Sequence, residues 1–149
     1  MSPSTFLLLN VALAFYNAGT IWALEVDIFR SWRLVDSKDF HRIQAAHWRK
    51  VPYWIFLPVG LAFAGSIALF WYRPTGTPAG FVWMAFLCQF ASHVLTAAFW
   101  GRWQAKLSQD ERGNASPYLA KILLTHWIRT ALINAYALIL LGSAVQLWG

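Results

Sequence analysis

Residues 123–148 read LLTHWIRTALINAYALILLGSAVQLW, an apolar run long enough to cross a lipid bilayer as one helix. Such a helix needs about 20 mostly apolar residues to span a hydrocarbon core of about 30 Å. Four runs of this kind lie at roughly residues 4–29, 51–72, 80–100 and 119–148. They predict one all-α domain over residues 1–149, an integral membrane antiparallel four-helix bundle.

The composition also favours a membrane protein over a soluble domain. Hydrophobic residues make up 58% of the chain and charged residues only 12%, and it contains ten tryptophans and eleven phenylalanines. The net charge of +6 would suit a nucleic-acid partner. The charges cluster between the apolar runs, however, so the expected partner is the lipid bilayer and not nucleic acid. The single cysteine, Cys88, excludes an internal disulfide and a CxxC motif.

The basic residues predict how the bundle is oriented in the membrane. The connections after the first and third runs hold ten of them: Arg30, Arg33, Lys38, Arg42, Arg49, Lys50, Arg102, Lys106, Arg112 and Lys121. The connection after the second run holds only Arg73. Because basic loops stay in the cytoplasm, both termini are expected on the non-cytoplasmic side of a bacterial inner membrane.

The first basic connection is itself expected to be partly helical. Its stretch KDFHRIQAAHWRK (38–50) is amphipathic at helical spacing, and Asp36 or Ser37 can cap a helix there. The second helix is therefore expected to extend back to about residue 37. Pro52 and Pro58 should kink it near the membrane surface.

Four polar side chains that are costly in lipid, Glu25, His47, His93 and His126, lie at similar predicted depths. At about 1.5 Å per residue, they fall in the cytoplasmic half of the bundle, within about 12 Å of one another along its axis. This half is therefore the place to look for a functional site.

Polar residues also share helix faces at about 100° per residue. The sets are Asn10, Asn17 and Glu25; Gln89, His93, Thr96 and Trp100; and His126, Arg129 and Thr130 with Asn134 at the edge. Lipid offers no hydrogen-bond partner, so these faces are expected to point inward. The pattern predicts a polar cavity in the cytoplasmic half.

Glu25 and Arg129 are the most costly of these groups, because a charge near the middle of a membrane helix costs about 2.5–3.5 kcal/mol. One interpretation is an ion pair between them that ties the first helix to the last. The other is that one or both hold a substrate or a metal. The two interpretations are compatible, since a buried pair alone is weak support for stability.

The histidines allow three interpretations. They can be hydrogen-bonding partners between helices, acid–base groups, or metal ligands. His47, His93 and His126 together with Glu25 would suit iron or copper, or zinc, although none has HExxH or ExxH spacing. Two imidazoles from facing helices could also hold a haem. The cofactor is thus left open: iron or copper, or none.

The stretches TAAFWGRWQAKL (96–107) and THWIRTALINAYALILL (125–141) resemble a family of four-span membrane proteins, the anthrone-oxygenase-like proteins. The resemblance places a threonine late in the third span at Thr96, and a Trp-x-Arg-Thr motif at Trp127, Arg129 and Thr130. The segment FWGRWQ (99–104) stands where many members have an Asn-rich exit. His126 stands where many have asparagine, as in a divergent, histidine-rich subgroup.

That resemblance implies oxidation of phenolic anthrones to quinones by dioxygen. The expected function is an oxygenase-like membrane oxidoreductase acting on a lipophilic aromatic, phenolic or quinone-like molecule. Arg129 would hold a phenolate or enolate oxygen, His126 or His93 would take the proton, and Glu25 would orient the base. The expected substrate-binding residues are Asn17, Gln89, Thr96, Trp100, Trp127 and Thr130. Two alternatives stay open: a small-molecule binding or transport protein, for which four spans would require a homodimer, and an accessory membrane subunit without catalysis.

Overall fold

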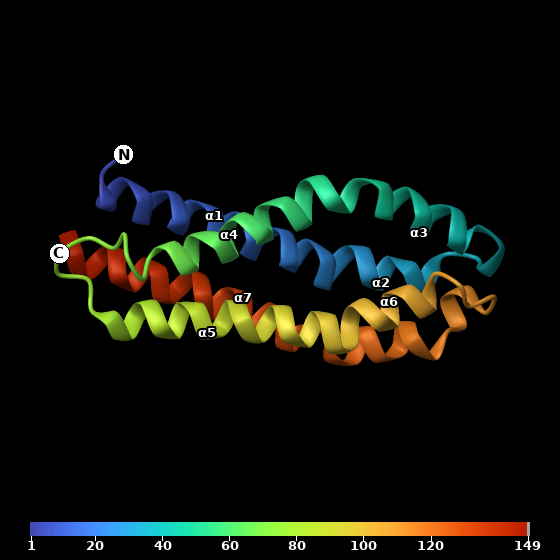
Figure 1. Ribbon diagram of the computed structural model, residues 1–149. Helices are drawn as coiled ribbons and strands as arrows, with labels where there is room; N and C mark the ends of the chain where they lie inside the picture. The colour runs from blue at the N-terminus through green and yellow to red at the C-terminus, as the bar shows by residue number, and fades with distance from the viewer. Residues whose placement is uncertain (149) are drawn as a thin grey trace.

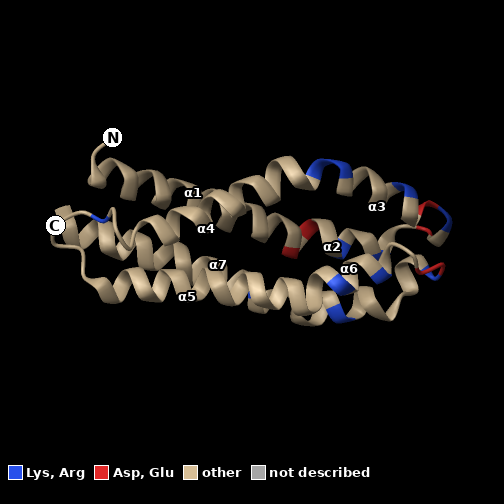
Figure 2. Cartoon of the chain, in the orientation of Figure 1, with Lys and Arg blue, Asp and Glu red and all other residues tan. Residues whose placement is uncertain are grey.

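The structure is a computed structural model that describes residues 1–148, and within them it is all-helical, without a β-strand (Figure 1). In that range, helices long and apolar enough to cross a membrane number four: Pro3–Leu34, Ser37–Ala68, Ala79–Leu107 and Pro117–Trp148. The prediction of an all-α chain with four membrane-length helices is confirmed. Both termini lie at one end of the elongated molecule (Figure 1). Most lysines and arginines gather at the opposite end, here called the charged end (Figure 2).

The long helices are composite. The first comprises α1 (Pro3–Ala23), η1 (Leu24–Ile28), α2 (Phe29–Ser31) and η2 (Trp32–Leu34). The second comprises α3 (Ser37–Val51), η3 (Pro52–Phe56) and α4 (Leu57–Ala68). The third comprises α5 (Ala79–Leu95), η4 (Thr96–Trp100) and α6 (Gly101–Leu107), and the chain ends with η5 (Gly113–Ala115) and α7 (Pro117–Trp148). The segments η1, η3 and η4 are π-helical, and η2 and η5 are 3₁₀-helical.

The helices differ in their boundaries from the apolar runs: the second ends earlier near the termini, and the first and third extend further at the charged end. The helix expected over 51–72 ends at Ala68, and the chain turns through residues 69–72. At the charged end the helices run further than the apolar runs, to Leu34 and Leu107. A 32-residue helix is about 48 Å long, well beyond a hydrocarbon core of about 30 Å. The basic residues therefore lie on helical extensions of the apolar segments.

Side-chain caps begin the first two long helices. The Ser2 hydroxyl accepts a hydrogen bond from the Thr5 amide (3.1 Å), and the Asp36 carboxylate accepts one from the Lys38 amide (3.2 Å). Ser37 instead donates to the Asn114 side chain (2.8 Å), which ties α3 to η5. These bonds satisfy amides that have no partner in the first turn of a helix.

Pro58 explains one contact between α1 and the second long helix. Proline has no N–H, so it leaves the carbonyl of Trp54 without its helical donor. The Tyr16 hydroxyl donates to that carbonyl (3.1 Å), and the Asn17 side chain donates to the Pro58 carbonyl (3.3 Å). Polar side chains on α1 thereby compensate for the proline in α4, as a membrane bundle requires.

Two close contacts join the helices in the half of the molecule near the termini, beside a depression of about 390 Å³ between α1 and α4. Tyr136 of α7 is fully buried, and its hydroxyl donates to the Ala62 carbonyl of α4 (3.2 Å). α1 approaches α4 at Gly65, where a Cβ atom would lie 1.9 Å from the Asn10 side-chain oxygen. Only glycine allows this separation, so Gly65 sets how close the two helices come.

Candidate functional site

The π-helical turns η1, η3 and η4 all border one small inner cavity of about 60 Å³. Its lining includes Leu24 from η1, Phe56 from η3, and Thr96 and Trp100 from η4. π-helical turns are rare and frequently occur at functional sites, since each adds one residue to a helical turn and redirects the neighbouring side chains. Here the three turns lie around the cavity that the buried His126 of α7 also lines.

Glu25 and His126 form the polar centre at the level of this cavity. The His126 Nδ1 and Glu25 Oε2 atoms are 2.9 Å apart, and both side chains are buried. The other carboxylate oxygen, Oε1, accepts a hydrogen bond from Arg30 Nη2 (3.2 Å). An ionised carboxylate only accepts hydrogen bonds, so His126 Nδ1 carries the hydrogen and Nε2 of the neutral ring keeps its lone pair.

That second nitrogen, His126 Nε2, is a buried acceptor. The ring is 1% exposed and lies edge-on to Phe29, with centroids 4.7 Å apart. Trp100 is the next aromatic ring, at 6.0 Å. Among residues 1–148, Nε2 has no hydrogen-bond partner, and the His126 side chain lines the inner cavity. A carboxylate-oriented imidazole with a free lone pair is the arrangement of a general base.

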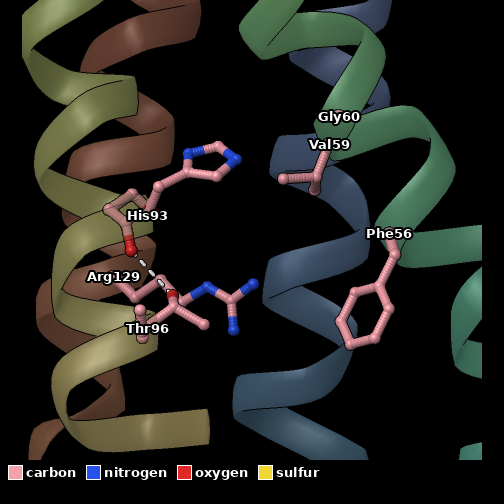
Figure 3. Close-up of a pocket in the computed structure, with 8 residues that line it drawn as sticks. Phe56, Val59, Gly60, His93, Thr96 and Arg129 are labelled. Atoms are coloured by element: carbon pink, nitrogen blue, oxygen red, sulfur yellow. Dashed lines mark hydrogen bonds between the residues drawn. The ribbon is translucent and has the colours of Figure 1, made fainter.

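Arg129 lies between the inner cavity and a larger outer pocket and lines both. In the described part of the chain, its buried Nε has no hydrogen-bond partner. The expected Glu25–Arg129 ion pair is wrong, because Glu25 pairs with His126 and Arg30. Arg129 projects from α7 into the space between the wall that carries His93 and Thr96 and the wall that carries Phe56 (Figure 3).

The outer pocket has a volume of about 280 Å³ and lies between the second and third long helices. One wall carries Phe56 and Gly60, and the other carries His93 and Thr96, with the Arg129 guanidinium between them (Figure 3). The pocket is therefore mostly apolar and contains one cation. Such a pocket suits a lipophilic molecule with an anionic oxygen.

The predicted metal site is not assembled. Over the described residues, the structure contains no group of three or more His, Cys, Asp or Glu side chains placed to hold a metal ion. His93 Nδ1 is 2.8 Å from the Gln89 carbonyl oxygen, and the ring packs on Phe63 at 4.5 Å. His47 lines the inner cavity but lies among Trp32 and other aromatic rings. The histidines thus share a depth, as expected, but not a centre, and they do not fit iron or copper.

The expected substrate-binding residues fall into three groups. Thr96 and Trp100 line the inner cavity, and the Trp100 indole N–H donates to the Thr125 hydroxyl (3.0 Å). Trp127 and Thr130 border a different depression, the groove between the first long helix and α7. Asn17 and Gln89 are buried between helices and lie outside the linings of these cavities.

Sequence reasoning missed three residues of the site. Phe56 and Gly60 form the wall opposite Arg129, and nothing in their local pattern distinguishes them from other apolar positions. Arg30 was assigned only to a basic connection, yet it bonds both the side chain and the carbonyl of Glu25. The signal for Arg30 was its position five residues after an intramembrane carboxylate.

A scan against protein-family models, a search of curated proteins and a search of solved structures each found no match to this chain. The function therefore has to be argued from the cavities and their polar groups.

Proposed function

We propose that the chain is a small oxygenase-like oxidoreductase of the membrane, acting on a lipophilic phenolic or quinone-like molecule. The observation that carries this proposal is the pairing of a cation with a base: Arg129 borders both the outer pocket and the inner cavity, and His126, whose Nε2 atom has no hydrogen-bond partner among the described residues, lines the inner one. The resemblance to anthrone-oxygenase-like proteins belongs to the same proposal.

The four long helices would cross a bacterial inner membrane as an antiparallel bundle. Both termini would lie on the non-cytoplasmic side and the charged end in the cytoplasm. The distribution of basic residues supports this orientation, because Arg73 alone lies in the connection after the second run while ten lie in the other two. The outer pocket would then open toward the lipid, from which a lipophilic ligand could enter.

In the first chemical step, Arg129 would stabilise a phenolate or enolate oxygen at the inner end of the outer pocket. His126 Nε2 would take the proton, and the Glu25 carboxylate would stabilise the imidazolium that forms. The resulting anion is electron-rich and is the form that dioxygen oxidises. For an anthrone, one oxygen atom would enter the quinone carbonyl and the other would leave as water.

The test uses the purified protein in detergent with a hydroxyanthrone as probe. Binding is followed by tryptophan fluorescence, and turnover by oxygen uptake together with quinone absorbance. We expect Glu25→Gln and His126→Gln to lower turnover by about 10²–10⁴-fold, the range of general-base catalysis, with little change in affinity. Retention of full turnover by both variants would exclude the Glu25–His126 pair as the base.

Access to the pocket is tested separately. A Cβ at Gly60 meets no atom within 4 Å, so Gly60→Leu can be accommodated and fills part of the outer pocket. Gly19 on α1 is equally open, and Gly19→Leu is the matched control. We expect only Gly60→Leu to weaken binding.

Binding without turnover would instead favour the transport alternative, in which the chain acts as a homodimer, and native mass measurement would then report a dimer. Failure of the wild-type protein to bind any lipophilic phenol would favour an accessory membrane subunit.

A further inference from the structure

The Glu25 carboxylate borders a depression that lies on the other side of α7 from the ligand pocket. This groove between the first long helix and α7 has a volume of about 380 Å³. We infer that the α1–α7 groove is a water-filled proton pathway that connects the Glu25–His126 pair with the charged end. The proton-carrying part of this inference rests on the proposed function, whereas the presence of water in the groove does not.

One side of the groove is polar, and the other side is formed by the apolar side chains Trp22, Val26, Trp127 and Ala131. Glu25, Arg30, Thr130 and Asn134 all contribute to the polar side. Asn134 accepts a hydrogen bond from the Trp22 indole (3.2 Å) and donates to the Thr130 carbonyl (2.8 Å). An ordered water needs two to four polar partners, and a cavity of this size holds several molecules.

Arg30 connects the groove with the charged end. Its side chain is 60% exposed, while that of Glu25 is 8% exposed. The guanidinium holds Glu25 at two points, the Oε1 atom (3.2 Å) and the backbone carbonyl (3.1 Å). A buried carboxylate thus contacts a cation that is exposed at the charged end. Arg30 itself does not carry the proton, since a guanidinium stays protonated, but it marks the open end of the groove. A proton arriving at Glu25 has a short polar route outward along this side of the bundle.

The imidazole of His126 lies between the groove and the inner cavity and contacts groups of both. Its Nδ1 atom bonds Glu25, which borders the groove, and the side chain also lines the inner cavity. In the proposed reaction Nε2 gains a proton from the ligand, and Nδ1 passes its own hydrogen to Glu25. Glu25 then releases its proton to water in the groove, and a ring flip of the imidazole brings the remaining hydrogen back to the Nδ1 position, which restores the starting state.

The ligand pocket and the groove are separate. The residues that line the outer pocket and those that line the groove have no member in common within the described chain. On α7, Arg129 faces the pocket while Trp127 and Ala131 face the groove. Residues two apart in an α-helix point about 160° from each other, which explains this division. A lipophilic ligand can therefore occupy one side while the proton leaves by the other.

The first experiment asks whether the groove contains water. In a Cys88→Ser background, Ala131→Cys places a thiol in the groove and Leu138→Cys places one on the exposed apolar surface of α7. A membrane-impermeant methanethiosulfonate reagent is added to reconstituted vesicles without any ligand. Because only the thiolate reacts and it forms in water, we expect Ala131→Cys to react at least about 10-fold faster than Leu138→Cys, from the charged-end side. Equal rates, or reaction from the opposite side only, overturn the inference.

The second experiment asks whether protons use the groove. Ala131→Trp plugs the groove and leaves the outer pocket unaltered. We expect kcat to fall about 10-fold while the Kd for the hydroxyanthrone is unchanged, the reverse of Gly60→Leu. An unchanged kcat in a folded Ala131→Trp protein overturns the proton pathway. If the wild-type protein binds no phenol, the proposed function fails, and the thiol rates still decide whether the groove is hydrated.

Discussion

The two halves of the bundle are built from the same long helices but packed differently. Near the termini, α1, α4 and α7 are regular α-helices. There Gly65 approaches the Asn10 side chain, and the buried Tyr136 hydroxyl donates a hydrogen bond to the Ala62 carbonyl. Toward the charged end, the π-helical turns interrupt the helices and leave cavities beside them. The terminal half also has a depression, of about 390 Å³, but Asn10 is the one polar side chain among its described lining residues, whereas the pockets toward the charged end are lined by Glu25, Arg30, His93 and Arg129. The halves therefore differ in the charge of their cavity linings.

The charged half also leaves polar atoms unsatisfied. His126 Nε2 and Arg129 Nε are both buried, and neither has a partner in the portion of the chain that the structure describes. An unpaired buried polar group costs about 1–3 kcal/mol, and a charged one costs more. Functional sites are where proteins tolerate such costs. Function and stability are therefore expected to respond in opposite directions to changes in this half.

The largest expected effect on ligand affinity comes from Arg129→Met, which keeps the length of the side chain and removes its charge. Affinity for a lipophilic phenolate should fall by about 10- to 100-fold, since a charge-assisted hydrogen bond contributes about 1.5–3 kcal/mol. The free energy of unfolding should rise, because an intramembrane charge is removed. Fluorescence titration and unfolding in mixed detergent micelles measure the two quantities.

Arg49→Met is the control for this change, because Arg49 is an exposed basic residue of α3. It should alter neither quantity. Tight phenolate binding by Arg129→Met would show that the cation does not hold the ligand.

The second prediction tests the packing difference directly with two glycines of α4. At Gly65 a Cβ would collide with Asn10, so Gly65→Leu should destabilise the protein by about 1–3 kcal/mol, the usual cost of overpacking. At Gly60 the space is open, so Gly60→Leu should change stability by less than about 0.5 kcal/mol. Equal losses for the two variants would mean that the halves are equally tight. Unfolding in mixed micelles decides between them.

The helices and the Glu25–His126 contact could be predicted from the sequence. Long apolar runs predict membrane helices because a backbone in lipid must satisfy its own hydrogen bonds. Glu25 and His126 were predicted to share a depth and an inward face, and their side chains are 2.9 Å apart. That prediction needed only the rise and the period of a helix.

The rest depends on tertiary packing. The turn LEVDI (24–28) reads as ordinary helix, and its π-helical form arises where the helices pack around the inner cavity. In a regular α-helix Arg30 would point about 140° away from Glu25, so their contact was not foreseen. Arg129 was expected to face Glu25 because residues 126, 129 and 130 share a broad face. A difference of tens of degrees in side-chain direction around the helix axis decides which neighbouring helix a side chain contacts. The helical period alone does not predict that direction accurately enough.

The smallest expected effect lies outside the membrane helices, in the loop between α6 and α7. Asp110 accepts hydrogen bonds from Arg112 Nε and Nη2, both at 2.9 Å, and from the Ser116 hydroxyl at 2.7 Å. Bonds from Arg112 first, and then from Ser116, hold the pKa of Asp110 well below its usual range. The carboxylate therefore contributes stability that is present above the unfolded-state pKa of about 3.9 and is lost as the pH falls through the lower folded-state pKa.

Asp110→Asn should accordingly be slightly less stable than the wild type at pH 7. This difference should stay constant from about pH 8 to pH 5, shrink below about pH 4, and decrease with added salt because the pair is solvent-screened. Glu111→Gln is the control, because it removes a charge from the same loop and leaves the hydrogen bonds of Asp110 in place. Unfolding midpoints measured across this pH range test the expectation, and a difference that persisted undiminished to pH 2 would contradict it. A pH-dependent stability at the charged end, set by Asp110, would show that electrostatic contributions are concentrated in the half that holds the charged groups.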